Sequence, residues 1–343
     1  MLSVSSAVTR ERLLSLLAGF QGRRLVVAGD FVLDRFLYGH PKRVSREAPV
    51  LILSFWKEES LPGGAGNTAA NVRSLGGVPL PVGAIGQDEF GASLRRVLSE
   101  RDIDVSGLCS AERFHTPTKT RILGGAPHSI KQQIVRYDRE DAVSADDPIR
   151  GALAERLRTF AAQADGAVLS DYGYGSIDPE AVGILRAAAR PGTPILVDSR
   201  HNLSRFRGVD AVTPNEEELE ECCGQTLGDS VEKLTAAGAA LSRTIECPTV
   251  LVTRGSRGMA LLEQGREAVL IPVHGTDQVA DVTGAGDTVL AAFSLAIATG
   301  ATALEAAHLA NFAGGVVVMK MGTAVATPDE VAQAIESDRT LLS

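Results

Sequence analysis

The sequence contains little cysteine, and its cysteines follow no structural pattern. Among 343 residues there are four, Cys109, Cys222, Cys223 and Cys247. They have neither the CxxC spacing of a zinc site nor the density of a disulfide framework. We therefore expect reduced thiols, no zinc and a cytoplasmic protein.

Excess positive charge and long apolar runs are lacking as well. The formal net charge is −8, whereas a protein that binds the nucleic-acid backbone needs a basic face that releases counterions. No apolar run approaches the roughly 18 residues of a membrane span, and the N-terminus lacks the order of a signal peptide. We expect a small-molecule partner, with no nucleic acid and no membrane. The spacing of Leu13, Leu14, Leu17 and Phe20 predicts a helix packed on the body.

What the sequence does contain is an alternation of short apolar runs and helical patterns between residues 160 and 260. The runs lie at 167–169, 195–197, 209–212 and 250–252. This alternation predicts a parallel sheet with helices on both faces. A polar residue follows each run, and ligands of such sheets bind at the carboxyl ends of the strands. The expected site is therefore near Asp171, Asp198, Asn215 and Thr253.

Two segments, 35–60 and 116–138, carry short β-like runs without intervening helices. We expect them to form a small antiparallel sheet that covers the site as a lid. The α/β body would then comprise residues 1–34, 61–115 and 139–343. Because an unpaired strand edge is a template for another strand, we also expect a homodimer formed through the lid.

The chemistry is expected at a glycine-rich turn, residues 281–287, which opens into an apolar helix. Gly284 and Gly286 let the backbone approach a ligand, and the first-turn N–H groups would form an anion hole. Asp287 could there accept a proton from an attacking hydroxyl. An ordinary helix start is the alternative. No GxxxxGK[ST] motif occurs, which argues against a P-loop kinase.

From about residue 24 to 330 the sequence resembles the PfkB or ribokinase family of carbohydrate kinases. Four motifs carry the resemblance in order: Gly29-Asp30 with Asp34, then 62–67, 213–218 and 281–287. It implies a ribokinase-like α/β fold, a doubly wound, mostly parallel sheet with a small β lid. It further implies ATP and Mg²⁺ as cofactors and Asp287 as catalytic base.

The resemblance also implies roles for other positions. The backbone of Gly284, Ala285 and Gly286 would stabilise the transferring phosphate, and Asn215 and Glu218 would organise magnesium, Glu218 through water. The sugar clamp would be Asp34, Gly63, Gly64 and Asn67. Nucleotide contacts would come from Asn215, Glu218, Thr253, Gly255, Gly258 and Asn311, although both of these glycines could be plain turn residues. Asp281, Thr283 and Gly322 match a K⁺ site found in some members.

Within the family, the sequence is most similar to kinases of D-glycero-D-manno-heptose 7-phosphate, which phosphorylate the anomeric hydroxyl in lipopolysaccharide core precursor synthesis. The segments that carry this similarity are 30–35 with 38–39, 43–50, 118–121 with 132–133 and 136, 169–172, 206–208 and 281–288. The substrate contacts implied are Lys119, Arg121, Arg136, Asp171 and Arg200. Two lysines of the heptose pattern are replaced, at Tyr174 and Arg200, so a hexose, a hexose phosphate or a nucleoside stays open as substrate. Because the chain ends at Ser343, we expect a kinase without a nucleotidyltransferase domain.

Two other interpretations compete. Residues 64–69 fit GxGxxA, with Asp88 as a following acid, as in a nicotinamide-dependent dehydrogenase. The preceding strand-like run ends near Trp56, so the tight strand-to-helix join of that motif is not expected. A sugar- or nucleotide-binding protein without catalysis is the second alternative, against which the intact Asp287 argues.

Overall fold

The computed structural model describes residues 8–125, 131–275, 282–320 and 322–341. Its main sheet has nine strands in the order β13-β12-β11-β10-β9-β8-β1-β4-β5. Their bounds are β1 Arg24–Gly29, β4 Val78–Gly86, β5 Leu108–Ala111, β8 Gly166–Asp171, β9 Ile195–Ser199, β10 Ala211–Val212, β11 Thr249–Thr253, β12 Met259–Glu263 and β13 Val269–Ile271. In this order, the seven neighbouring strands from β11 to β5 pair in parallel. At the other end of the sheet, β12 pairs antiparallel with β11, and β13 pairs antiparallel with β12.

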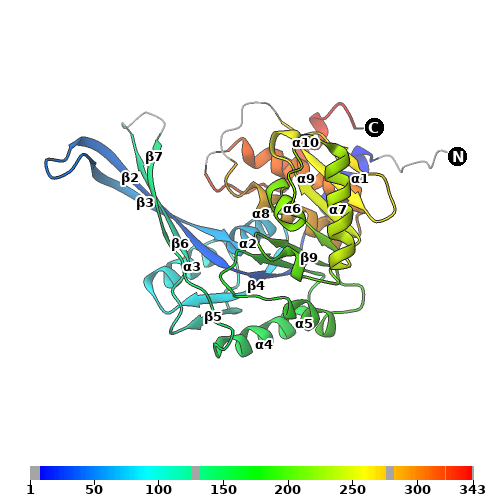
Figure 1. The fold of residues 1–343 in the computed structure, drawn as a ribbon, viewed down its shortest axis with the longest axis horizontal. Coiled ribbons are helices and arrows are strands. Elements are labelled where there is room, and N and C mark those ends of the chain that lie inside the picture. Colours follow the sequence, from blue (N-terminus) through cyan, green and yellow to red (C-terminus); the bar gives the residue numbers. More distant parts are fainter. Residues whose placement is uncertain (1–7, 126–130, 276–281, 321, 342–343) are drawn as a thin grey trace.

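Both faces of this sheet are buried, as the alternation of side chains in β1 shows. Leu25 and Val27 point into one hydrophobic core and Val26 and Ala28 into the other, because successive side chains of a strand face opposite sides. The first core is covered by α1 Arg10–Ala18, α2 Ala65–Ser74, α3 Glu89–Ser99, α8 Ala285–Ala298, α9 Ala303–Val318 and α10 Pro328–Ser337. The second is covered by α4 Ile149–Ala161, α5 Glu180–Ala188, α6 Glu216–Cys223 and α7 Val231–Ile245. This is the predicted doubly wound body (Figure 1).

A second sheet projects from the body, where the sequence predicts the lid (Figure 1). Its order is β3-β2-β6-β7, from β2 Phe31–Val44, β3 Leu51–Gly64, β6 Thr118–Gly124 and β7 Gln132–Arg139. The expectation of an antiparallel sheet was wrong at its centre, since β2 and β6 pair in parallel. These two strands are joined through body elements, which allows the parallel direction. The expected boundaries after residues 34 and 60 fall inside β2 and β3, so the lid strands reach into the body.

The turn at Gly64 differs from the expectation in its local structure. β3 runs to Gly64 and α2 begins at Ala65, so the strand-to-helix join judged absent from the sequence is present. However, β3 pairs antiparallel with β2 in the lid, whereas the next strand, β4, lies in the main sheet. A dinucleotide-binding unit needs both strands in one parallel sheet. The dehydrogenase interpretation therefore fails for a reason other than the one inferred from the sequence.

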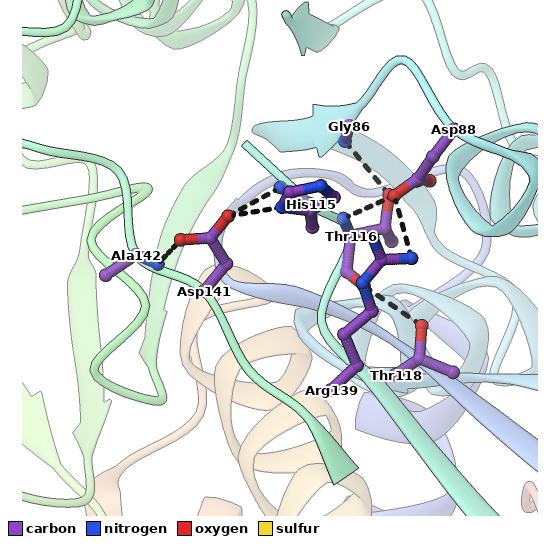
Figure 2. A network of polar contacts seen from close by, with 8 residues as sticks. All are labelled: Gly86, Asp88, His115, Thr116, Thr118, Arg139, Asp141 and Ala142. Atoms are coloured by element: carbon purple, nitrogen blue, oxygen red, sulfur yellow. Dashed lines mark hydrogen bonds and ion pairs between the residues drawn. The ribbon is translucent and has the colours of Figure 1, made fainter. Parts of the chain in front are cut away.

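Asp88, the acid of that alternative, serves instead to anchor the lid. Its carboxylate accepts from the Gly91 backbone as the N-cap of α3, and from the backbone and hydroxyl of Thr116 at 3.0 and 2.8 Å. Figure 2 shows the continuation of this network: Asp141, beyond β7, accepts from the backbone N–H of His115, before β6, at 2.9 Å. The entry and exit of the outer lid hairpin are thus joined to each other and to α3.

The N-terminal helix agrees with the expectation from the sequence. In α1 Leu13 and Leu17 are buried, as is Phe20 behind it, so this helix packs on the body. All four cysteines carry free thiols. Across the described part of the chain, no helix combines the length and the hydropathy that crossing a membrane takes.

Candidate active site

A cavity of about 290 Å³ opens at the carboxyl ends of β8 to β11, between these strands, the start of α8 and the lid. The sequence predicts fourteen of its lining residues: Asp34, Gly64, Asn67, Lys119, Arg121, Asp198, Arg200, Asn215, Glu218, Thr253, Thr283, Gly284, Gly286 and Asp287. Segments far apart in the chain therefore meet at the place expected for a ligand of an open α/β sheet.

The glycine-rich turn starts α8 in a form that only glycine fits. Gly284 has φ +79, and a Cβ there would lie 2.5 Å from Asn67 Nδ2. Gly286 differs, because nothing lies within 4 Å of the position that its Cβ would take. It faces the cavity, so its missing side chain leaves room for a ligand beside the first-turn N–H groups, which have no acceptor within the helix.

Asp287, in this first turn, is 5% exposed and is held at both oxygens. Asn67 Nδ2 donates to Oδ2 at 2.7 Å, and Tyr172 Oη donates to Oδ1 at 2.9 Å. Burial raises the pKa of Asp287 to about 6, against the lowering effect of these hydrogen bonds. A carboxylate with a pKa just below neutrality suits a general base that must be ionised in the resting protein.

The body side of the cavity carries two further carboxylates, Asp198 and Glu218. Asn215 and Glu218 form a capping box on α6, with Glu218 Oε2 accepting from the Asn215 backbone at 2.9 Å. Burial, followed by the charge of Glu218, raises the pKa of Asp198 well above its usual range, and burial raises that of Glu218. Carboxylates that repel one another around a cavity are suited to a cation. Magnesium keeps most of its waters and uses few protein ligands. That preference fits the pair of carboxylates of Asp198 and Glu218. Among the described residues there is no cluster of three or more His, Cys, Asp or Glu that could enclose a metal.

The lid contributes cations to the cavity. Arg121 forms an ion pair with Asp34, with 13% and 9% of the two side chains exposed. Lys119 and Arg200 lie over the ring of Tyr172, 5.4 and 4.3 Å from its centroid. Burial, and next the charge of Arg200, lowers the pKa of Lys119. Two neighbouring cations that disfavour each other's charge would both gain from an anionic ligand.

Comparison with known proteins identifies what this cavity belongs to. Residues 26–330 match the model of the pfkB family of carbohydrate kinases, which is most of the chain. The chain belongs to this family. The prediction of a carbohydrate kinase is thereby confirmed, and ATP is the implied phosphoryl donor. The non-catalytic binding protein and the dehydrogenase are no longer needed as explanations.

Relatives and solved structures add detail. Bifunctional protein HldE of Caulobacter sp. (strain K31) is 41% identical over 91% of this chain and 62% of that protein. The HldE protein of Paramagnetospirillum magneticum is 39% identical over 93% and 64%. This pfkB chain thus spans less than two thirds of the length of these relatives. Arabidopsis thaliana ribokinase, complexed with ribose and ATP, superposes with a TM-score of 0.70 at 22% identity, over 93% of this chain and 100% of that one. Phosphofructokinase-2 from Escherichia coli gives 0.73 at 19%, over 92% and 98%. They confirm the ribokinase-like fold.

Several residues predicted for the site do not line the cavity. Arg136 is bidentate to Asp138 on the lid surface, at 2.9 and 2.7 Å. Asp171 accepts from Ser199 Oγ and the Gly173 backbone, which shapes the loop after β8. Gly63 lies behind Asp34, since a Cβ there would meet Asp34 Oδ2.

The outer nucleotide positions also lie outside the cavity. Gly255 and Gly258 form the turn between β11 and β12, and a Cβ on Gly258 would meet the Ile271 carbonyl oxygen at 2.1 Å. Asn311 Nδ2 donates to the Pro272 carbonyl oxygen at 2.8 Å. Of the remaining predicted residues, Ala285 is the first residue of α8 and Gly322 lies in the loop after α9, next to the cavity residue Thr323. Asp281 lies outside the described residues.

Tyr172, Thr213 and Thr323 line the cavity without having been assigned a role from the sequence, whereas Asp198 was expected there as the polar end of its strand. Thr213 Oγ1 donates to Asp198 Oδ1 at 3.1 Å, while the buried hydroxyl of Thr323 has no hydrogen-bond partner among the described residues. Thr213 directly follows a strand-like run, so the rule that placed Asp198 could have found it. The signals for Tyr172 were its position directly after Asp171 and its place in the 169–172 segment that carries the resemblance to heptose-phosphate kinases.

Proposed function

We propose that this chain transfers the γ-phosphoryl group of ATP to the anomeric hydroxyl of D-glycero-D-manno-heptose 7-phosphate, with Asp287 as the general base. The observation that carries the reaction is the pairing of a buried carboxylate with open helix-start amides at one cavity wall. The heptose assignment is supported by the sequence resemblance to heptose-phosphate kinases and by the cations of the lid.

In the proposed mechanism the sugar lies between Asp34 and Asp287 in the cavity. The acceptor hydroxyl gives its proton to the Asp287 carboxylate as its oxygen bonds to the γ-phosphorus, and the bond from that phosphorus to the bridging oxygen of ADP breaks. The N–H groups at the start of α8 donate to the oxygens of the transferring group. Magnesium, when bound, would neutralise triphosphate charge, with Glu218 and Asp198 as the carboxylates that could hold it, Glu218 through water.

The 7-phosphate is the part of the substrate that the cations of the cavity favour. Lys119 comes from the lid strand β6 and Arg200 follows β9 of the body, so one anion could contact both. An unphosphorylated sugar would leave these two neighbouring cations with only acidic side chains of the protein, such as Asp34 and Asp198, as counter-charges. Arg200 thus stands in for one of the two lysines of the heptose pattern, whereas Tyr174 donates to Glu140 at 2.9 Å.

A substrate screen tests the proposal. ADP release would be measured with heptose 7-phosphate, the unphosphorylated heptose, hexoses, hexose phosphates and nucleosides, and the phosphorylated carbon would be determined by ³¹P and ¹³C NMR. Heptose 7-phosphate should give the highest kcat/KM, with phosphate added at the anomeric carbon. A nucleoside or free hexose as the best substrate would reject the heptose assignment while leaving the kinase reaction intact.

A monovalent cation close to Thr283 and Gly322 is also part of the proposal. It is supported by the left-handed turn of Gly322, φ +72, and by the position of Thr283 at the cavity wall. Replacing K⁺ by tetramethylammonium in the assay should lower kcat, and equal rates in both salts would remove this cation.

The lid is the proposed homodimer interface. Large hydrophobic side chains that stay exposed gather on it: Val44, Val50, Leu51, Phe55, Trp56, Ile134, Val135 and Tyr137. An apolar surface of this kind on a soluble domain marks an interaction site. Tyr137→Lys should convert a dimer to a monomer in sedimentation velocity, whereas Leu270→Lys, on the exposed strand β13, should not. A wild-type chain that sediments as a monomer would refute the interface.

A further inference from the structure

Tyr172 is the residue of the cavity that lies closest to the proposed base without an assigned role. Its hydroxyl donates to Asp287 Oδ1 at 2.9 Å, while Asn67 holds Oδ2 from the other side. The Thr68 hydroxyl makes a longer contact of 3.4 Å to the same Oδ1. Two donors on different elements therefore fix the carboxylate in one orientation.

The tyrosine is itself fixed by the protein. Its backbone N–H donates to Asp30 Oδ2 at 2.9 Å, as does that of Tyr174, and Ser176 donates to Oδ1. Asp30 is 1% exposed. The Tyr172 ring lies against Gly64, where a Cβ would stand 3.5 Å from Cε2, and Arg200 covers it at 4.3 Å. The carboxylate of the buried Asp30 thus fixes the loop that carries Tyr172.

We infer that Tyr172 is a positioning residue for Asp287, which holds Oδ1 so that the carboxylate is ionised and correctly aimed at the acceptor hydroxyl. This inference rests on the proposed function. It gives Asp30 the role of anchoring the 172–176 loop. It gives Arg200 the role of covering the Tyr172 ring and so holding it in place.

Charged groups from the lid and from the body act on the ionisation of Asp287. Asp34 of the lid, together with Asp198 near the end of β9, opposes ionisation, whereas Arg200 favours it. A hydroxyl donor also favours the charged form of a carboxylate. Without the Tyr172 hydroxyl, burial and the two acids would act with less opposition, so the pKa of Asp287 would rise above its value of about 6.

In its hydrogen bond to the ionised Asp287, Tyr172 is the donor. Burial, and next the charge of Asp287, raises its pKa well above the ordinary value for tyrosine, so the phenol keeps its proton at any pH at which the protein works. An ionised carboxylate is an acceptor only. The polarity of this hydrogen bond is therefore set by the chemistry of both partners.

The test is Tyr172→Phe in the full chain, because it removes the hydroxyl and keeps the ring under Arg200. The wild type should lose kcat/KM as the pH falls through about 6. In the variant we expect this acid limb to move up by on the order of one pH unit, with kcat near neutrality reduced about tenfold, partial recovery at pH 9 and an unchanged KM for ATP. Thr68→Val, which loses the longer contact, should give a smaller shift in the same direction.

Tyr174→Phe is the matched control, since that hydroxyl lies two residues further on and donates to Glu140; its acid limb should stay where the wild type has it. An unmoved limb in Tyr172→Phe, or a loss of kcat equal at every pH, would overturn the inference. A ¹³C-carboxyl NMR titration measures the same shift in the pKa of Asp287 without turnover. It therefore separates a failure of this inference from a failure of the proposed reaction, which would appear as an active Asp287→Asn enzyme.

Discussion

The two walls of the cavity differ in how they are built. On the body wall, Asp287, Asn67 and Glu218 are held by short hydrogen bonds to helix starts or to one another. On the lid wall, Lys119 comes from a strand of a projecting sheet that keeps many apolar side chains exposed. We expect the body wall to keep this arrangement whatever the sugar is, and the lid wall to distinguish one sugar from another.

This difference separates reaction from specificity. The helix-start turn can stabilise a transferring phosphoryl group whatever the acceptor is, because it contacts only that group and the attacking oxygen. In the proposed mechanism, residues of the lid and of the β9 end contact the rest of the sugar. Changes on the body wall should therefore lower kcat for every substrate, and changes on the lid wall should act on one substrate class.

The largest effect is expected for Asp287→Asn. The amide can still accept a hydrogen bond but cannot take the proton, so kcat should fall about a thousandfold, while ATP binds within a few-fold of the wild type. ADP release and isothermal titration calorimetry measure the two quantities. Near-normal turnover would falsify the role of the base, and lost ATP binding would indicate a damaged wall instead.

Lys119→Met is the corresponding change on the lid wall. Removing the ammonium from an anion site should raise KM for a phosphorylated sugar roughly tenfold to a hundredfold, with little change for ATP or for the same sugar without phosphate. Arg136→Met is its control, since that guanidinium pairs with Asp138 outside the cavity. An equal rise in KM for both sugars would show that Lys119 does not recognise the phosphate.

The sequence predicted the local parts of the site better than the contacts between distant segments, and the reason is physical. The 281–287 turn and the Asn215–Glu218 capping box are local, so a few neighbouring residues specify them. The bond from Tyr172 to Asp287 joins residues 115 positions apart, which no local pattern records. Arg136 was expected in the site from the resemblance to heptose-phosphate kinases, whereas its ion pair with Asp138 holds it on the lid surface.

The lid strands also show why some of the fold escaped prediction. β3 is an edge strand whose residues 55–59 are exposed, so it lacks the apolar alternation of a half-buried strand and seemed to end near Trp56. The parallel pairing of β2 with β6 depends on the body segment between them. The absence of helical patterns in the two segments predicted a lid. It did not predict how the lid strands pair with one another.

Glu218→Gln refines the comparison within the body wall. Glutamine can replace glutamate in a capping box, so α6 should keep its start while a carboxylate near the proposed magnesium is lost. We expect about a tenfold lower kcat/KM for ATP at limiting magnesium, with recovery at higher magnesium. Glu217→Gln, the exposed neighbour, should behave as the wild type. A deficit that magnesium does not relieve would point to the helix rather than the metal.

The smallest effect is expected where the two walls are joined, at the lid anchor of His115 and Asp141. The pKa of Asp141 is lowered, because the hydrogen bonds from His115 and Ala142 outweigh the raising effect of burial. A carboxylate with a depressed pKa stabilises the fold above its unfolded pKa and loses that contribution as the pH falls through the folded value. Since both side chains are partly exposed, Asp141→Asn should lower the free energy of unfolding at pH 7 by less than about 1 kcal/mol. Thermal unfolding from pH 7 to pH 3 measures this, and the gap to the wild type should shrink below about pH 4. A gap that stays constant across that range would mean that the anchor stabilises the lid through backbone geometry alone.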